Sequence, residues 1–305
     1  MRHLRNILFA SVLLSCTATI AQQLPQFTQY MYNTISINPA YAGSRETLSA
    51  VVLYRSQWTD IDNGPTTPTV SVHSPLRNEK IGLGASLIHD ELGYENFTYI
   101  YGDFSYTIHT GPNTKLAFGV MGGFTSYTLD SEFRTQNATD PNISGIEDQW
   151  APNFGAGMLW HTNRWYLGLS APRLLNTNYN DNSDYEAVER VGYYFTGGYV
   201  FDLSNNVKFK PAFLVKATNG APMSYDLTAN FLFYEKLWVG AGYRINESAA
   251  AIGGIVDFQI SKQFRIGYAY ENPISDIRPY SGGTHEFLLM FELFKEQRIK
   301  SPRYF

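Results

Sequence analysis

The sequence contains one cysteine, Cys16, and few charged residues, since Asp, Glu, Lys and Arg make up 16% of the chain. Soluble domains usually reach about a quarter. A single cysteine excludes a disulfide framework within the chain. The net charge is −4, and nucleic-acid binding normally needs a basic face, so a nucleic-acid partner is not expected.

Long apolar runs are also missing. Beyond the first 21 residues no stretch reaches the roughly 18 uninterrupted apolar residues that suggest a membrane helix. Aromatic residues, in contrast, make up 15% of the chain, with 22 Tyr and 20 Phe. Low charge and abundant aromatics together indicate a surface that faces lipid between aromatic girdles. Only helices and closed barrels satisfy their backbone polar groups in lipid, so this composition favours a closed barrel.

The first 21 residues have the features of a secretory signal. Arg2 and Arg5 precede the apolar stretch 7–14, and small residues lead to a cleavage site after Ala21, which makes Gln22 the mature start. Removing two arginines and no acid would change the net charge from −4 to −6. An alternative remains, because residues 13–16 resemble a lipobox that would make Cys16 a lipidated N-terminus. We favour Ala21, and mass spectrometry of the mature N-terminus would decide.

The dominant period of the remaining chain is two, as in β-strands. In the stretch 264–271, for example, Phe264, Ile266, Tyr268 and Tyr270 alternate with smaller or polar residues. We count about fourteen such segments, each close to the ~10 residues of a tilted membrane strand, with twelve or sixteen also compatible. They begin near Glu46, Thr67, Lys80, Glu95, Lys115, Pro152, Arg164, Arg190, Asn206, Ser224, Lys236, Ser248, Gln263 and Thr284.

The connections between these segments alternate in length. Short ones at 76–79, 110–113, 161–163, 203–205, 235 and 261–262 alternate with generally longer ones that include 59–66, 129–150, 172–189 and 272–283. Outer-membrane barrels have short periplasmic turns and longer outer loops. The sequence therefore predicts an all-β fold, a transmembrane antiparallel β-barrel. Pro211 should mark a bulge or strand end, because proline cannot donate a ladder hydrogen bond.

Four parts are expected: a signal peptide 1–21, an N-terminal periplasmic or plug-like segment 22–45, a barrel 46–294 and a periplasmic tail 295–305. The segment 22–45 is too apolar for a free tail. It packs into the barrel mouth or docks on a partner, and we favour packing because it needs no second protein. Its candidate contact residues are Phe27, Tyr30, Tyr32, Asn38, Pro39 and Tyr41.

No motif indicates catalysis or a cofactor. The histidines beyond the signal lack metal-ligand spacing, and Asp60 begins a calcium-like loop whose twelfth position is Ser71 instead of the required Glu. Polar residues share the less apolar face of several strands. We favour a solvated lumen wall over a lumen that seats a peptide or the N-terminal segment, because polar interiors are general to such barrels. These residues are Arg55, Lys208, Lys210, Lys216, Arg244, Arg265, Asp226, Asn230 and Glu286.

Several blocks resemble PorP/SprF proteins. The blocks 26–33 (QFTQYMYN) and 38–44 (NPAYAGS) are similar to the opening signature of that family. The stretches 54–58 (YRSQW), 81–84 (IGLG), 266–270 (IGYAY) and 283–286 (GTHE) resemble later strands, and 301–305 (SPRYF) resembles the family's end. Glu271 departs mildly, since an Asp would be expected there.

The resemblance implies an outer-membrane component or accessory of the type IX secretion system. It also implies partners: the periplasmic lipoprotein ring, other outer-membrane subunits, and the C-terminal domain of a secreted substrate, which for some members is a gliding adhesin of the type B class. Outer-membrane lipid would surround the barrel. Two other functions stay open from the residues themselves, a passive pore or small-ligand transporter and an outer-membrane enzyme, of which we do not favour the enzyme. Aromatic anchors for a protein partner would be Trp150, Tyr179, Tyr185, Tyr280 and Phe133, since aromatics dominate interface energetics.

Overall fold

The computed structural model describes residues 25–130, 148–179, 188–247 and 249–293. The expected signal peptide with Ala21 and Gln22, the tail 295–305, Phe133 and Tyr185 lie outside these residues. Three 3₁₀ turns occur, η1 (Thr34–Ser36), η2 (Pro39–Tyr41) and η3 (Arg278–Tyr280), and none of the described helices is long and apolar enough to cross a membrane.

Fourteen long strands form the wall of one closed antiparallel barrel in the described part of the chain. They are β1 (Leu48–Ser56), β2 (Thr66–Pro75), β3 (Ile81–Leu92), β4 (Glu95–His109), β5 (Lys115–Leu129), β6 (Gln149–His161), β7 (Trp165–Ala171), β10 (Gly192–Tyr199), β12 (Val207–Thr218), β13 (Ser224–Phe233), β14 (Leu237–Ile245), β15 (Ala251–Gln259), β16 (Phe264–Pro273) and β17 (Thr284–Leu293). The two-residue β11 (Phe201–Asp202) extends β10, and β8 (Thr177–Asn178) pairs with β9 (Val188–Glu189) apart from the wall.

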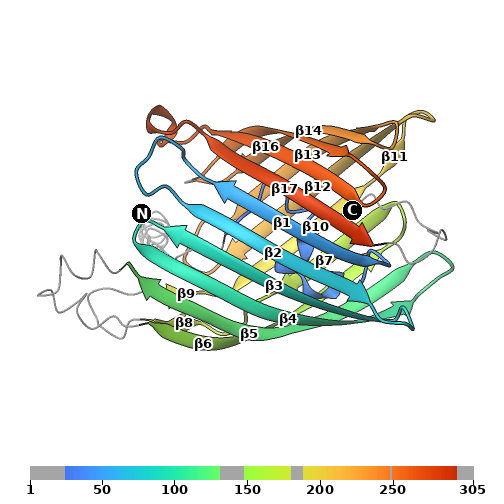
Figure 1. Ribbon diagram of the computed structural model, residues 1–305, viewed down its shortest axis with the longest axis horizontal. Helices are drawn as coiled ribbons and strands as arrows, with labels where there is room; N and C mark the ends of the chain where they lie inside the picture. The colour runs from blue at the N-terminus through green and yellow to red at the C-terminus, as the bar shows by residue number, and fades with distance from the viewer. Residues whose placement is uncertain (1–24, 131–147, 180–187, 248, 294–305) are drawn as a thin grey trace, which may run out of the picture.

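Neighbouring strands in the sequence are also neighbours in the barrel, apart from the closure (Figure 1). Closure is made by β1 and β17, which pair from Leu48↔Leu293 to Ser56↔His285. The predicted fold class is confirmed, and each of the fourteen predicted segments corresponds to one long strand of the wall.

The alternation predicted from the sequence separates a lipid-facing side from a lumen side. Along β16, Phe264 and Ile266 are exposed on the outside, whereas Ala269 and Glu271 are buried inside. Large apolar side chains such as Val120, Phe154 and Phe287 are each more than half exposed. A belt of this size would be an aggregation hazard in water and is the normal lipid-facing surface of a membrane barrel.

Pro211 does not end or bulge its own strand, contrary to the prediction. The strand β12 continues through it, and Pro211 pairs with Ala229 of β13. The interruption lies in the neighbouring strand instead. β10 ends at Tyr199 and β11 begins at Phe201, opposite the position where Pro211 has no N–H to donate.

The two ends of the barrel differ in their connections. We call the end with the connections 57–65, 130–148, 172–191 and 274–283 the long-loop end, and the opposite end the short-turn end. The other three connections at the long-loop end are short, namely 93–94, 219–223 and 246–250. Strand lengths are unequal too: β4 and β5 each have 15 residues, whereas β7 has 7.

Candidate functional site

Residues 25–47, here the lumen segment, run inside the barrel before β1 begins. The segment begins at the long-loop end, where the side chain of Gln26 donates to Ser224 and Asp226 near the start of β13. It reaches the short-turn end before Leu48 and turns back into β1. In Figure 1 it is the dark blue trace seen behind the front strands.

All six candidate residues of this segment are buried in the lumen. Phe27, Tyr30 and Tyr32 belong to one apolar cluster with residues of the barrel wall, and Tyr41 belongs to a second cluster. Asn38 caps η2, because its side chain accepts from the amide of Ala40, and Pro39 occupies the first turn, where a missing N–H costs little. The local sequence thus favours the short turn η2 within the lumen.

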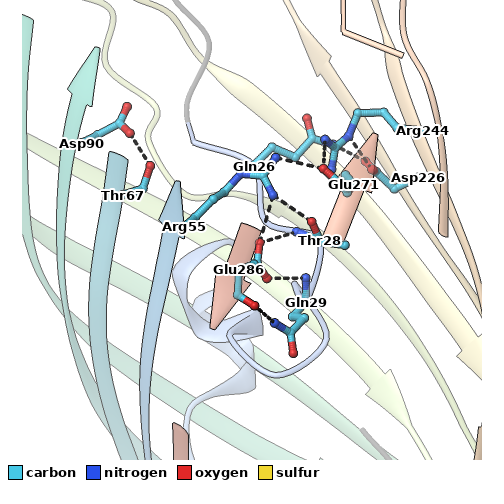
Figure 2. A network of polar contacts seen from close by, with 10 residues as sticks. All are labelled: Gln26, Thr28, Gln29, Arg55, Thr67, Asp90, Asp226, Arg244, Glu271 and Glu286. Carbon is cyan, nitrogen blue, oxygen red and sulfur yellow. Dashed lines mark hydrogen bonds and ion pairs between the residues drawn. The ribbon is translucent and has the colours of Figure 1, made fainter. Parts of the chain in front are cut away.

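A polar network holds the segment at the long-loop end (Figure 2). Arg55 of β1 forms ion pairs of 3.0 Å with Glu286 of β17 and with Glu271 of β16. Arg244 of β14 lies 2.7 Å from Asp226 and 3.0 Å from Glu271. All five side chains are buried, so each charge depends on its partners for the stabilisation that water would otherwise give.

The lumen segment completes this network with its backbone. Glu286 accepts hydrogen bonds from the amides of Thr28 at 2.9 Å and Gln29 at 2.7 Å, and Arg55 donates to the Thr28 hydroxyl at 2.8 Å. The prediction that favoured a solvated lumen wall is therefore wrong here, because these wall residues seat the N-terminal segment.

A second group of wall charges surrounds Tyr32. The Tyr32 hydroxyl donates to Asp257, and the cationic ends of Lys210 and Arg265 lie 5.7 and 5.4 Å from the centre of its ring. Lys210 also lies over the ring of Trp238 at 4.7 Å. Such cation–π contacts offset part of the cost of burying a charge.

On β3, β5 and β6 the wall packs closely against the segment because it carries glycines there. A Cβ added at Gly119 would lie 2.1 Å from the backbone nitrogen of Ala40, and one at Gly82 would lie 2.0 Å from the carbonyl oxygen of Ala42. At Gly157 the corresponding position is filled by the side chain of Asn38. Glycine is needed at these wall positions because the segment occupies the space of a side chain.

The connection after β7 also folds into the barrel at the long-loop end. Its residues 172–179 and 188–191, here the mouth strap, place the Arg173 guanidinium 4.3 Å from the centre of the Tyr99 ring, and Arg173 pairs with Glu189 at 3.2 Å. Tyr179 packs on Phe97 and donates to Glu189 at 2.8 Å. Burial, and then the Glu189 carboxylate, raise the pKa of the Tyr179 hydroxyl well above its usual range.

The remaining candidate contact residues differ in exposure. Tyr179 is 5% exposed and is occupied within the protein, whereas Trp150 is 59% exposed and Tyr280 is 73% exposed, both at the long-loop end. Tyr94, in the short β3–β4 turn, is 46% exposed at the same end and was not singled out from the sequence. The sequence pattern that could have predicted this exposed residue is a tyrosine next to a glycine, Gly93, in a tight turn.

Within the described residues, no group of three or more His, Cys, Asp or Glu side chains is placed to hold a metal ion. The histidines have structural contacts: the His73 ring accepts from the Gly43 amide at 3.1 Å, and the His285 ring contacts the Tyr268 hydroxyl at 2.7 Å. What the arrangement offers chemically is a filled lumen and exposed aromatic side chains at its long-loop end.

The sequence model of one family, described as type IX secretion system membrane protein PorP/SprF, matches residues 19–291. The chain belongs to the PorP/SprF family. Its role is therefore that of a membrane protein of type IX secretion, located in the outer membrane. The match covers the opening blocks 26–33 and 38–44, so in this family member the opening signature is the segment that fills the lumen.

Solved structures with the same fold include two transport barrels. The CymD monoaromatic hydrocarbon channel is 12% identical, with a TM-score of 0.51 and coverage of 86% of this chain and 91% of that one. The toluene transporter TbuX of Ralstonia pickettii is 10% identical, with a TM-score of 0.50 and coverage of 84% and 91%. At such identities they establish the barrel fold alone. No curated protein matches the chain.

Proposed function

We propose that this PorP/SprF protein is a non-catalytic component or accessory of type IX secretion that binds a secreted or surface protein and aids its export or retention. The partner's C-terminal domain, such as the type B domain of a gliding adhesin, is the proposed ligand. The observation that carries this proposal is the filled lumen, since a barrel blocked by its own chain acts through its exposed ends.

The proposed contact surface is the long-loop end. Among the described residues of this end, Trp150 and Tyr280 are the aromatic side chains with the largest exposed fraction, and rigid aromatics are the usual anchors of protein interfaces. At the short-turn end Tyr234 is 69% exposed, in the turn between β13 and β14, and it serves as a matched control.

Affinity capture from detergent-solubilised outer membranes tests the proposal. We expect the wild-type protein to retain a secreted protein through its C-terminal domain, and Trp150→Ala with Tyr280→Ala to lose about tenfold or more of that retention, as for the loss of an aromatic anchor. Tyr234→Ala should retain the partner. Loss in Tyr234→Ala alone would move the contact to the short-turn end, and retention of no protein partner by the wild type would contradict the function itself.

The alternative function, a passive pore or small-ligand transporter, is tested by reconstitution in planar bilayers. The lumen segment and the mouth strap both occupy the path through the barrel, so we expect no steady conductance from the wild-type protein. Conductance at the level of an open barrel, with secretion unchanged in a deletion strain, would favour the pore.

A further inference from the structure

Among the fourteen long strands described, β1 and β17 are the only neighbours in the wall that are not consecutive in the sequence, and the line where they pair is here the seam. We propose that the lumen is a peptide-binding site for residues 25–47 of the same chain, and that seating of this segment holds the β1–β17 seam closed. The segment is thus an internal clasp as well as a plug.

At the long-loop end, one carboxylate joins the three parts of the clasp. Glu286 belongs to β17, forms an ion pair with Arg55 of β1, and accepts the amides of Thr28 and Gln29 from the lumen segment. Glu286 is fully buried, so an opening of the seam there would leave charges and amides without partners in an apolar surrounding.

At the short-turn end the segment crosses the seam a second time. Arg45 forms an ion pair with Glu292 of β17 at 2.7 Å, and the Thr47 hydroxyl donates to the carbonyl oxygen of Leu293. Arg45 and Glu292 are both buried. The lumen segment therefore contacts β17 at both ends of the seam.

The middle of the segment presses against the wall far from the seam. The turn η2 contacts β4, β5 and β6, and its backbone lies against Gly119 of β5. Because the segment spans the lumen between this wall and the seam, displacing it at Gly119 should release its contacts with β17 without altering any residue of the seam.

The need for a clasp follows from chain connectivity. Every other pair of neighbouring wall strands is adjacent in the sequence, whereas β1 and β17 are separated by the whole barrel. Bringing distant strands together costs more loop-closure entropy than folding a hairpin. Interactions across this seam must therefore offset a larger loss of entropy than those between any other pair of strands.

Hydrogen exchange of the full-length protein in detergent tests the clasp. Gly119→Val places a side chain where Ala40 lies, whereas Gly122→Val, the matched control on the same strand, meets no atom within 4 Å of its Cβ position. We expect amide exchange in β1 and β17 to rise by about tenfold or more in Gly119→Val, because local opening of the seam becomes easier. Exchange in β12 and β13 should rise less, because these strands lose their contacts with Gln26 and Tyr32 but remain joined by a turn. The control Gly122→Val should exchange at the wild-type rate throughout.

A second variant keeps the test decisive if Gly119→Val does not fold. Asn38→Ala adds no bulk to the wall but removes the bond from the Asn38 side chain to the Met158 carbonyl oxygen at 3.1 Å and the cap of η2. We expect a smaller rise of exchange in β1 and β17. A rise confined to β5 and β6, or a uniform rise around the wall, would overturn the proposal, because either would show that the segment only fills space.

Discussion

The lumen segment is held in two different ways on its two sides. Toward β1, β16 and β17 it is held by charge: Arg55, Glu271 and Glu286 form a buried network that includes the segment's own amides. Toward β5 and β6 it is held by shape, since glycines at 119 and 157 leave room for its backbone and for the Asn38 side chain. The charged contacts hold the segment toward β1, β16 and β17, and the close packing at the glycines fixes its position along the lumen.

The difference predicts two kinds of failure. On the charged side, loss of one partner leaves the others buried without compensation, which is costly in free energy. On the glycine side, nothing is lost by substitution, but any added atom competes with the segment for the same space. The following variants separate the two sides, in order of the expected effect.

Glu286→Ala should cause the largest loss, about 3–5 kcal/mol of unfolding free energy, because Arg55 and two amides then remain buried without this partner. Urea unfolding in detergent, followed by the heat-sensitive electrophoretic mobility of the barrel, measures it. Glu91→Ala is the matched control on exposed β3, where the pairs of Glu91 with Thr66 and His89 lie near solvent. Equal losses in both variants would contradict the prediction, because they would show that the buried contacts of Glu286 contribute no more than an exposed pair.

Gly119→Val should destabilise the protein by about 1–3 kcal/mol, as overpacking does, and should also displace the lumen segment. Limited proteolysis in detergent should then cleave within residues 25–47 in this variant and leave them intact in Gly122→Val, whose added Cβ meets open space. Destabilisation without cleavage there would mean that the segment remains seated and that the wall yields instead.

Asn38→Ala should cost about 1 kcal/mol, the usual value for loss of a side-chain cap. The same unfolding measurement applies. Asn78 offers a comparison, because its side chain also accepts backbone amides, those of Lys80 and Ile81, but in an exposed turn. Asn78→Ala should therefore change stability less than Asn38→Ala, and the reverse order would argue against the role given to the segment.

Asp202→Asn should have no measurable effect on the unfolding midpoint. Asp202 pairs with Arg164 and Lys208 at the exposed rim of the short-turn end, where water screens the charges. Its hydrogen bond from Lys208 lowers the pKa of the Asp202 carboxyl, so the group stays ionised at neutral pH. A clear loss of stability would show that the rim contributes as much as the lumen.

The wall could be predicted from the sequence because its signal is local. Alternation with a period of two places Ile266 outside and Glu271 inside, whatever the rest of the chain does. Alternating connection lengths then gave the two ends of the barrel. Family resemblance, which the matching sequence model confirms, rested on blocks of a few residues each.

The interior could not be predicted in the same way. The amide of Thr28 meets Glu286 across 258 residues of sequence, and Tyr32 meets Asp257 across 225, distances at which no periodicity carries information. The inward fold of the mouth strap was missed for the same reason, since Arg173 and Tyr179 stand in a long polar connection. One signal was present, namely glycines at lumen positions of β3, β5 and β6 together with an apolar N-terminal segment.

The unequal strands give the molecule a tall side and a low side. Fifteen residues of β4 or β5 extend about 50 Å, whereas the nine residues of β14 or β15, on the opposite side of the barrel, extend about 30 Å, at roughly 3.3 Å per residue. Even with the usual tilt, β4 and β5 exceed the height of the roughly 25 Å apolar band of such barrels. The β4–β5 side therefore extends beyond the apolar band and the β14–β15 side does not, so a protein that approaches along the membrane plane meets a higher wall on one side than on the other.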